Sequence, residues 1–283
     1  MNQDENFTGA SWIRADMPHD HNTTYEESVM KENIAMQGRV ALVTGAGVGI
    51  GRACAVALGQ AGVFVGVHYH RSRDGAEQTL ANIRSAGGDG FIIEADLKNE
   101  MAANKLVDQV IKVGGGLNVL VNNAGSLVGR ASIEDTTLEI WKETIDINLT
   151  SAFMVVRRAI AALRASGNGT IINILSLSVQ TGGANGAGAY AAAKGGLTTF
   201  TRTLARELAP QVRTNSVMPG VIETRHHEVA TSKERMAEYR DQTPLSRNGK
   251  AEEVAEAVMF LASDASSFVN GAMIDVNGGR FLR

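Results

Sequence analysis

From Gly38 onward, short apolar runs rich in β-branched residues alternate with longer segments of helical character. Runs that are apolar throughout are typical of strands buried on both faces of a parallel sheet. The runs that fit this description are 39–44, 63–69, 91–94, 117–122, 170–176, 213–218 and 273–276. This pattern predicts a seven-stranded parallel sheet.

The segments between these runs are long and helix-prone, as at 50–61, 132–165 and 190–209. Strands that alternate with helices indicate an α/β sheet with helices on both faces. Right-handed crossovers then make one doubly wound, Rossmann-like domain the expected architecture. The charged stretch 223–247 interrupts the alternation, and we expect a lid there.

The first 36 residues are rich in Asn, Asp, Glu, His and Thr, and they lack the apolar core of a signal peptide. We therefore expect a polar N-terminal extension at 1–36 and a catalytic domain at 37–283. Trp12, Ile13 and Tyr25 are set among polar residues in the extension. Two interpretations of the extension are compatible with this sequence. Either the extension lies over the core or a neighbouring subunit, or it is disordered.

The composition limits the kinds of partner that the protein can bind. A formal charge of -3 and a pI of about 6.1 give no electrostatic case for nucleic acid or an anionic membrane. No stretch reads as long and apolar enough to span a bilayer. A single cysteine, Cys54, excludes an internal disulfide and fits a reducing compartment. We expect a cytoplasmic protein that binds a small molecule and other copies of itself, with no metal site.

A glycine-rich turn follows the first predicted strand directly, since 44–51 reads TGAGVGIG and continues into a helical pattern. Glycines let the backbone approach a pyrophosphate, and the helix N-terminus offers unpaired N–H groups to it. The spacing differs from the usual dinucleotide fingerprint. A simple tight turn is the alternative, but the strand–turn–helix context favours dinucleotide binding by Gly45, Gly47, Gly49, Ile50 and Gly51.

The end of the second predicted strand bears on the choice between NADP and NAD. In NAD-binding Rossmann proteins an acidic residue in this region binds the ribose 2′-hydroxyl. Here 67–72 reads VHYHRS, and the next carboxylate is Asp74. A cation and a hydroxyl suit a 2′-phosphate, so we favour NADP, with Arg71 and Ser72 as contacts. NAD stays possible if Arg71 only caps a solvated loop.

Tyr190 and Lys194 lie four residues apart in a helical pattern, which places them on one face. Free tyrosine has a pKa of about 10, so it needs a nearby positive charge to exchange protons near neutral pH. Lys194 supplies such a charge. In isolation the spacing is also compatible with two unrelated surface side chains.

Five elements together resemble the short-chain dehydrogenase/reductase family: the turn at 44–51, the NNAG sequence at 122–125, Asn148, Ser176 and the Tyr190–Lys194 pair. They come in the family's order, and PGVIET at 219–224 and VNGG at 276–279 extend the likeness. The resemblance runs from about residue 38 to the C-terminus and leaves 1–36 outside.

The resemblance implies roles for four side chains. Tyr190 would be the general acid in carbonyl reduction and the base in alcohol oxidation. Lys194 would lower the pKa of Tyr190 and bind the nicotinamide ribose, Ser176 would hold the substrate oxygen, and Asn148 would anchor a relay water. Ser176 is one residue further from Tyr190 than the family's serine usually is, and Ser178 is one residue nearer. The position after the strand favours Ser176 and leaves Ser178 as the alternative.

The resemblance also implies cofactor contacts outside the glycine turn. Asp96 and Leu97 follow the third strand where the family contacts adenine, although Asp96 also suits the N-cap of the next helix. The remaining implied contacts, besides Tyr190 and Lys194, are Tyr69, Asn123, Ala124, Gly125, Pro219, Gly220, Ile222 and Thr224.

The sequence is most similar to the family's 3-oxoacyl reductases. The loop 177–189 carries no charge and so offers no clamp for a carboxylate. The segments 164–169 and 210–213 show little of the basic surface that would dock an acidic carrier protein. This weakens the hypothesis that the substrate is bound to such a carrier. We expect NADP-dependent reduction of a 3-oxoacyl thioester or related β-keto compound. The alternatives are a dehydrogenase of sugars, polyols or other secondary alcohols and, more remotely, a silent dinucleotide-binding subunit. Because members of the family commonly form tetramers, the resemblance implies a homotetramer, with a dimer as second choice.

Overall fold

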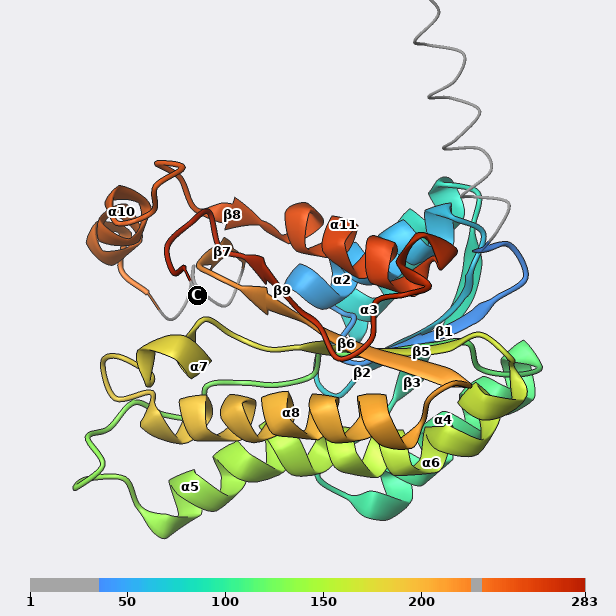
Figure 1. Cartoon of the computed structure of the whole chain (residues 1–283), viewed down its shortest axis with the longest axis horizontal. Helices are drawn as coiled ribbons and strands as arrows, with labels where there is room; N and C mark the ends of the chain where they lie inside the picture. The colour runs from blue at the N-terminus through green and yellow to red at the C-terminus, as the bar shows by residue number, and fades with distance from the viewer. Residues whose placement is uncertain (1–35, 225–230, 283) are drawn as a thin grey trace, which may run out of the picture.

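The computed structural model describes residues 36–224 and 231–282. Its main sheet has seven parallel strands in the order β3-β2-β1-β4-β5-β6-β9 (Figure 1). They are β1 (Val40–Val43), β2 (Phe64–Tyr69), β3 (Asp89–Glu94), β4 (Val119–Asn122), β5 (Gly169–Ile174), β6 (Val212–Pro219) and β9 (Met273–Val276). The predicted doubly wound α/β architecture is confirmed, and each predicted run overlaps one of these strands.

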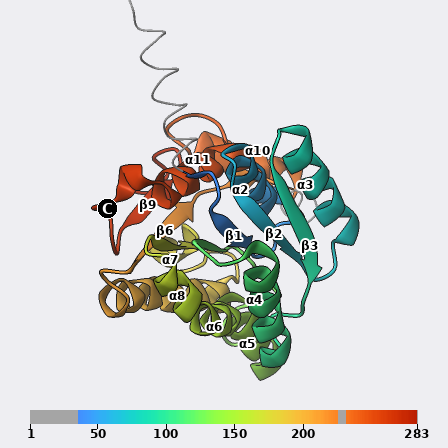
Figure 2. The ribbon, with the colours of Figure 1, turned by 90° about the vertical axis from the view of Figure 1, so that its right-hand side faces the viewer.

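The helices form one layer on each face of this sheet, as Figures 1 and 2 show from two directions. One layer holds α2 (Gly49–Gln60), α3 (Arg73–Ser85) and α11 (Ala251–Ala262). The other holds α4 (Glu100–Gly114), α5 (Leu138–Ile145), α6 (Ser151–Ala165) and α8 (Gly188–Glu207). The strand order reverses between β1 and β4, and the carboxyl ends of strands at such a point form the usual ligand crevice.

The central strands are apolar on both faces because each face has its own core. In β1, Ala41 and Val43 belong to the core beneath α2 and α11. Val40 and Leu42 point the opposite way, into the core beneath α4 and α6. Strict alternation of direction along a strand produces this division. It explains why the sequence reads as continuous apolar runs.

The predicted helix at 132–165 is wrong in its first part. The α-helix begins at Leu138, where the Thr137 side chain caps it by accepting a hydrogen bond from the N–H of Ile140. Upstream, the Ser132 hydroxyl donates to Asp135 at 2.5 Å and so favours a local turn. A π-helical turn, η1 (Asp146–Thr150), then separates α5 from α6.

The region expected to form a lid starts with β7 (Ile222–Glu223), which pairs with β8 (Gly249–Lys250). It continues into α10 (Lys233–Asp241), none of whose residues is buried. The Tyr239 ring of α10 lies against Arg280, whose guanidinium carbon is 4.6 Å from the ring centroid. Residues 225–230 and the predicted extension up to residue 35 lie outside the described residues. Within the described ranges, no helix meets the length and apolarity needed to cross a membrane.

Candidate functional site

The glycine turn lies between β1 and α2, at the carboxyl end of the sheet. Gly45 and Gly49 have φ of 65° and 54°, in the left-handed region that favours glycine. The N-cap residue Val48 provides no side-chain cap, and the first turn of α2 has no acidic residue. Its backbone N–H groups and the positive end of the helix dipole therefore suit an anion. The turn fits a dinucleotide pyrophosphate.

The turn is held against the end of β4 by Thr44 and Asn123. The Asn123 side-chain amide donates to the carbonyls of Thr44 and Gly45 at 2.9 and 3.1 Å. The Thr44 hydroxyl in turn accepts from the N–H groups of Asn123 and Ala124, both at 3.0 Å. A Cβ on Gly51 would lie 2.3 Å from the Gly45 carbonyl oxygen. Only glycine permits this close packing, which brings the predicted contacts 123–125 beside the turn.

The start of α3 closes the turn on another side. A Cβ on Gly47 would lie 2.5 Å from the Ser72 hydroxyl. The Arg52 guanidinium donates to the Gly47 carbonyl at 2.6 Å and to the Gly75 carbonyl at 3.2 Å, which ties the turn to α3. Ser72 is therefore adjacent to the turn, whereas Arg71 is exposed.

Asp96 and Leu97 follow β3, as the sequence predicts. Asp96 accepts a hydrogen bond from the N–H of Lys98 at 3.0 Å. The alternative role of Asp96 as a helix cap is wrong, because the side chain of Asn99 caps α4 by accepting from the N–H of Ala102. Asp96 is left half-exposed at the carboxyl edge of the sheet.

Ser176, Tyr190 and Lys194 come together at the end of β5 and the beginning of α8. The Ser176 side chain lies close enough to the Tyr190 hydroxyl to lower the pKa of Tyr190. Burial acts more strongly, so the pKa of Tyr190 lies above its usual value of 10.0. The free protein thus holds a protonated phenol at neutral pH.

Lys194 is buried, and its Nζ donates to the Ile174 carbonyl at 2.8 Å. Nζ lies 5.8 Å from the centroid of the Tyr190 ring. Burial lowers the pKa of Lys194 to about 8, because a desolvated ammonium is costly. At neutral pH the ammonium remains the charge that faces the Tyr190 ring.

Ser178, the alternative to Ser176, has a different environment. Its backbone N–H donates to the Ser176 hydroxyl at 3.2 Å. Its own hydroxyl oxygen is buried and has no hydrogen-bond partner in the part of the chain that is described. Ser176, and not Ser178, therefore acts on the pKa of Tyr190.

Asn148 lies in the π-helical turn η1 and is buried. Its side-chain amide donates to the carbonyls of Ser126 and Thr144 at 2.8 and 2.9 Å, and its Oδ1 accepts from the Ser126 N–H at 3.1 Å. A Cβ on Gly125 would lie 2.5 Å from Asn148 Oδ1 and 3.3 Å from Lys194 Nζ. The π-turn therefore directs Asn148 toward the predicted catalytic lysine, and π-turns recur at functional sites.

The segment 219–224 borders the opposite side of the crevice. The Pro219 carbonyl accepts from the N–H of Leu177 at 2.9 Å, which connects this segment to the loop that follows Ser176. A Cβ on Gly220 would lie 2.8 Å from Cα of Asn277. Ile222 is buried, and the Thr224 methyl group lies 3.3 Å from the Cβ position of Gly49. The segment thus returns to the glycine turn.

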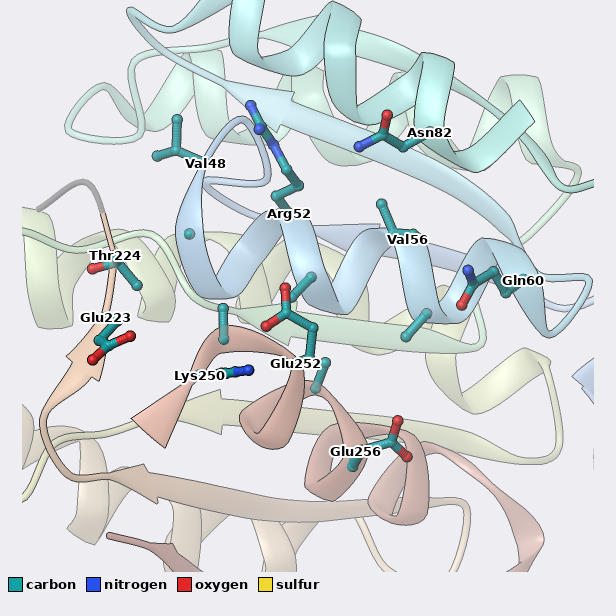
Figure 3. Close-up of a pocket in the computed structure, with 15 residues that line it drawn as sticks. Val48, Arg52, Val56, Gln60, Asn82, Glu223, Thr224, Lys250, Glu252 and Glu256 are labelled. Atoms are coloured by element: carbon teal, nitrogen blue, oxygen red, sulfur yellow. The ribbon is translucent and has the colours of Figure 1, made fainter. Parts of the chain in front are cut away.

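A groove of about 610 Å³ begins at Val48 and Gly49 and runs between α2 and α11 (Figure 3). Its rim carries Glu223, Glu252 and Glu256, while Tyr190 and Lys194 do not line it. Arg52 and Lys250 also line the groove, so its charges are mixed and do not mark it as an extension of the anion site. The candidate chemistry is located at the crevice beside the groove.

His68, which the sequence motifs do not single out, is buried near the end of β2 and bonded to the glycine turn. The signal was available, because a histidine inside an apolar strand must find partners for two ring nitrogens. Cys54 is buried as expected, and burial raises the pKa of its thiol to about 12.

Comparisons with known proteins identify the family of this chain. A family model described as enoyl-(acyl carrier protein) reductase matches residues 45–280. The chain is 38% identical over 252 residues to the 3-oxoacyl-[acyl-carrier-protein] reductase FabG of Aquifex aeolicus, an alignment that covers 88% of this chain and 99% of that protein. It is 34% identical over 249 residues to glucose 1-dehydrogenase 2 of Bacillus subtilis, with 87% and 96% covered.

Among solved structures, one described as an NADH-dependent reductase, A1-R′, responsible for alginate metabolism matches with a TM-score of 0.81. It is 32% identical, and the match covers 88% of this chain and 99% of that one. The family's acid–base pair, glycine turn and NNAG segment lie together at one sheet edge in this chain. The chain belongs to the short-chain dehydrogenase/reductase family, whose members are oxidoreductases that act on CH–OH groups with a nicotinamide cofactor.

Proposed function

We propose that this chain is an NADP-dependent reductase of a 3-oxoacyl thioester or a related β-keto compound. The observation that carries the proposal is the contact between a protonated Tyr190 and Ser176, with the Lys194 ammonium facing the same ring. The protonated phenol is the form that can give a proton to the substrate oxygen in a reduction. The uncharged loop 177–189 suits a substrate without a carboxylate near its reacting carbon.

A bound reduced nicotinamide supplies the hydride that converts the carbonyl carbon to an alcohol carbon. Tyr190 gives its phenolic proton to the oxygen on which negative charge develops. Ser176 donates a hydrogen bond to the same oxygen and stabilises that charge. The Lys194 ammonium stabilises the Tyr190 phenolate that the transfer leaves. Asn148 holds the backbone of Ser126, next to Gly125, whose Cβ position lies 3.3 Å from Lys194 Nζ. By the family resemblance, Asn148 would also anchor the water through which the phenolate regains its proton.

Preference for NADP rests on the residues after β2. No carboxylate occurs within 68–73, Ser72 lies against the glycine turn, and Arg71 is free to face a 2′-phosphate. The solved relative described as NADH-dependent supports the opposite choice. Replacing Arg71 with Glu tests the point: kcat/KM should fall about tenfold or more with NADPH and hardly change with NADH. Arg84→Glu, at the far end of α3, is the matched control. Equal loss with both cofactors would contradict the assignment.

Substrate class is tested by following oxidation of NADPH and NADH with a panel of carbonyl compounds. The panel holds a β-keto thioester, a β-keto ester, a diketone and a 2-enoyl thioester, and glucose with NADP or NAD tests the reverse direction. We expect the β-keto compounds to give the highest kcat/KM. Turnover of glucose alone would favour the alternative that the Bacillus subtilis relative represents. Reduction of the enoyl thioester alone would favour the description of the family model.

We also propose that the chain assembles as a homotetramer, with a dimer as second choice. The outer face of α5 and α6 exposes Leu138, Trp141 and Phe153. Phe153 contacts Phe200 of α8 at a centroid distance of 6.1 Å, so the apolar surface continues onto the next helix. Light scattering should give four times the subunit mass of 30.0 kDa. A monomer mass would contradict the proposal.

A further inference from the structure

His68 joins two separate segments of the nucleotide half of the crevice. It lies on β2, with 2% of its surface exposed, and it points away from the core that holds Val67 and Tyr69. Its Nδ1 accepts from the N–H of Gly45 at 3.0 Å, and its Nε2 lies 3.1 Å from the Ala95 carbonyl oxygen.

These contacts fix the protonation of the ring. Nδ1 faces an N–H group and must accept, whereas Nε2 faces a carbonyl and must donate. The neutral ring with its proton on Nε2 is the form that satisfies both. Burial lowers the pKa of His68 to about 4, in agreement with a neutral ring at physiological pH.

The two bonds connect the parts of the site that would hold opposite ends of an ADP moiety. Gly45 opens the glycine turn, and Ala95 immediately precedes Asp96 and Leu97. The backbone of His68 adds a third bond, because its carbonyl accepts from the N–H of Ala46 at 2.8 Å. A backbone bond from the Ala95 N–H to the Tyr69 carbonyl at 3.0 Å holds the loop after β3 to β2 in the same way. The imidazole is the side chain that bonds both segments at once.

We propose that His68 is a positioning residue: it holds the glycine turn and the Asp96–Leu97 loop at a fixed separation, and so sets the affinity for the dinucleotide without touching it. The proposal rests on the proposed function only in that the chain binds a nicotinamide dinucleotide.

Three substitutions separate the two side-chain bonds. In His68→Leu, the Gly45 N–H and the Ala95 carbonyl both lose their partner. In His68→Asn, the shorter side chain still offers an acceptor to Gly45 but does not reach Ala95. In His68→Gln, the longer side chain still offers a donor toward Ala95. The control is Ser266→Ala, which removes a buried hydroxyl that bonds the carbonyls of Leu261 and Ser263 far from the crevice.

The first readout is the dissociation constant of NADPH, and separately of NADH, measured by calorimetry without substrate. We expect His68→Leu to weaken binding of the preferred nucleotide about tenfold or more, because each unpaired buried group disturbs the segment that carries it. The dissociation constants of His68→Asn and His68→Gln should lie between those of His68→Leu and the parent. Ser266→Ala should unfold at lower urea concentration with an unchanged dissociation constant. A dissociation constant within twofold of the parent in all three His68 variants would overturn the proposal.

The second readout is amide hydrogen exchange in the nucleotide-free protein. The His68 variants should exchange faster at 45–51 and at 95–97 than the parent, with little change in β5 and β6. A uniform rise over the whole sheet would mean that His68 only contributes to global stability, and the proposal would fail. If the parent binds neither NADPH nor NADH, the proposed function fails, whereas exchange still reports whether His68 couples the two segments.

Discussion

Replacing Lys194 with Met should stabilise the free protein at neutral pH while it removes activity. Burial lowers the pKa of Lys194 from 10.5 to about 8. Keeping the ammonium charged at pH 7 therefore lowers the free energy of unfolding by about 3 kcal/mol. The variant loses the bond from Nζ to the Ile174 carbonyl, and an unpaired buried carbonyl costs about 1–2 kcal/mol. The net expectation is a gain of about 1–2 kcal/mol. Turnover should fall about 10²–10⁴-fold because the Tyr190 phenolate loses its counter-charge.

The pH dependence of this gain has a definite sign. Below pH 8 Lys194 is charged in both the folded and the unfolded chain, and the full cost is present. Between pH 8 and 10.5 the folded chain releases the proton while the unfolded chain retains it, so the parent gains stability as pH rises. Lys194→Met lacks this titrating group, so its gain in stability over the parent should shrink over the same pH range. Urea unfolding at neutral and at alkaline pH measures the difference. A variant less stable than the parent at pH 7, or an advantage that does not shrink as pH rises, would refute the reasoning.

Three further outcomes are expected. Gly51→Ala places a Cβ 2.3 Å from the Gly45 carbonyl oxygen, so it should both destabilise the protein and weaken nucleotide binding, as calorimetry would show; parent-like affinity would count against the turn as the binding site. Ser176→Ala should lower kcat about 10²-fold or more while Ser178→Ala leaves it nearly intact, and the reverse result would reassign the serine. His68 titrates near pH 4 folded and 6.5 unfolded, so stability should fall by about 3 kcal/mol in total as pH drops through that interval, and His68→Asn should flatten the decline in urea unfolding.

The fold was predictable because its central strands are buried on both faces. Val40, Leu42, Ala41 and Val43 contribute to two separate cores, and such a strand has a continuous apolar signature. Element boundaries were less predictable. The helix expected from residue 132 begins at Leu138 because Ser132 and Asp135 bond each other locally, and such short-range competition does not show in periodicity.

The candidate site was predictable where its members lie at fixed spacing in one element, as Tyr190 and Lys194 do on α8. Contacts between residues of different elements could not be predicted in this way. Asn148 is directed inward by a π-turn, a backbone feature that leaves no sequence spacing to recognise. His68 bonds Gly45 and Ala95 across two loops, and only the sheet register brings these segments together.

The most direct test of the central claim, that Tyr190 delivers the proton in a nicotinamide-dependent reduction, is a comparison of Tyr190→Phe with the parent protein. NADPH binding is measured by calorimetry, and NADPH oxidation by absorbance with a β-keto thioester. The phenyl ring keeps the packing of the tyrosine but has no proton to give. We predict that Tyr190→Phe still binds NADPH, with an affinity lowered by no more than the loss of one hydroxyl contact, and that its turnover is reduced about 10²–10⁴-fold. Turnover by Tyr190→Phe at the parent's rate would contradict the account.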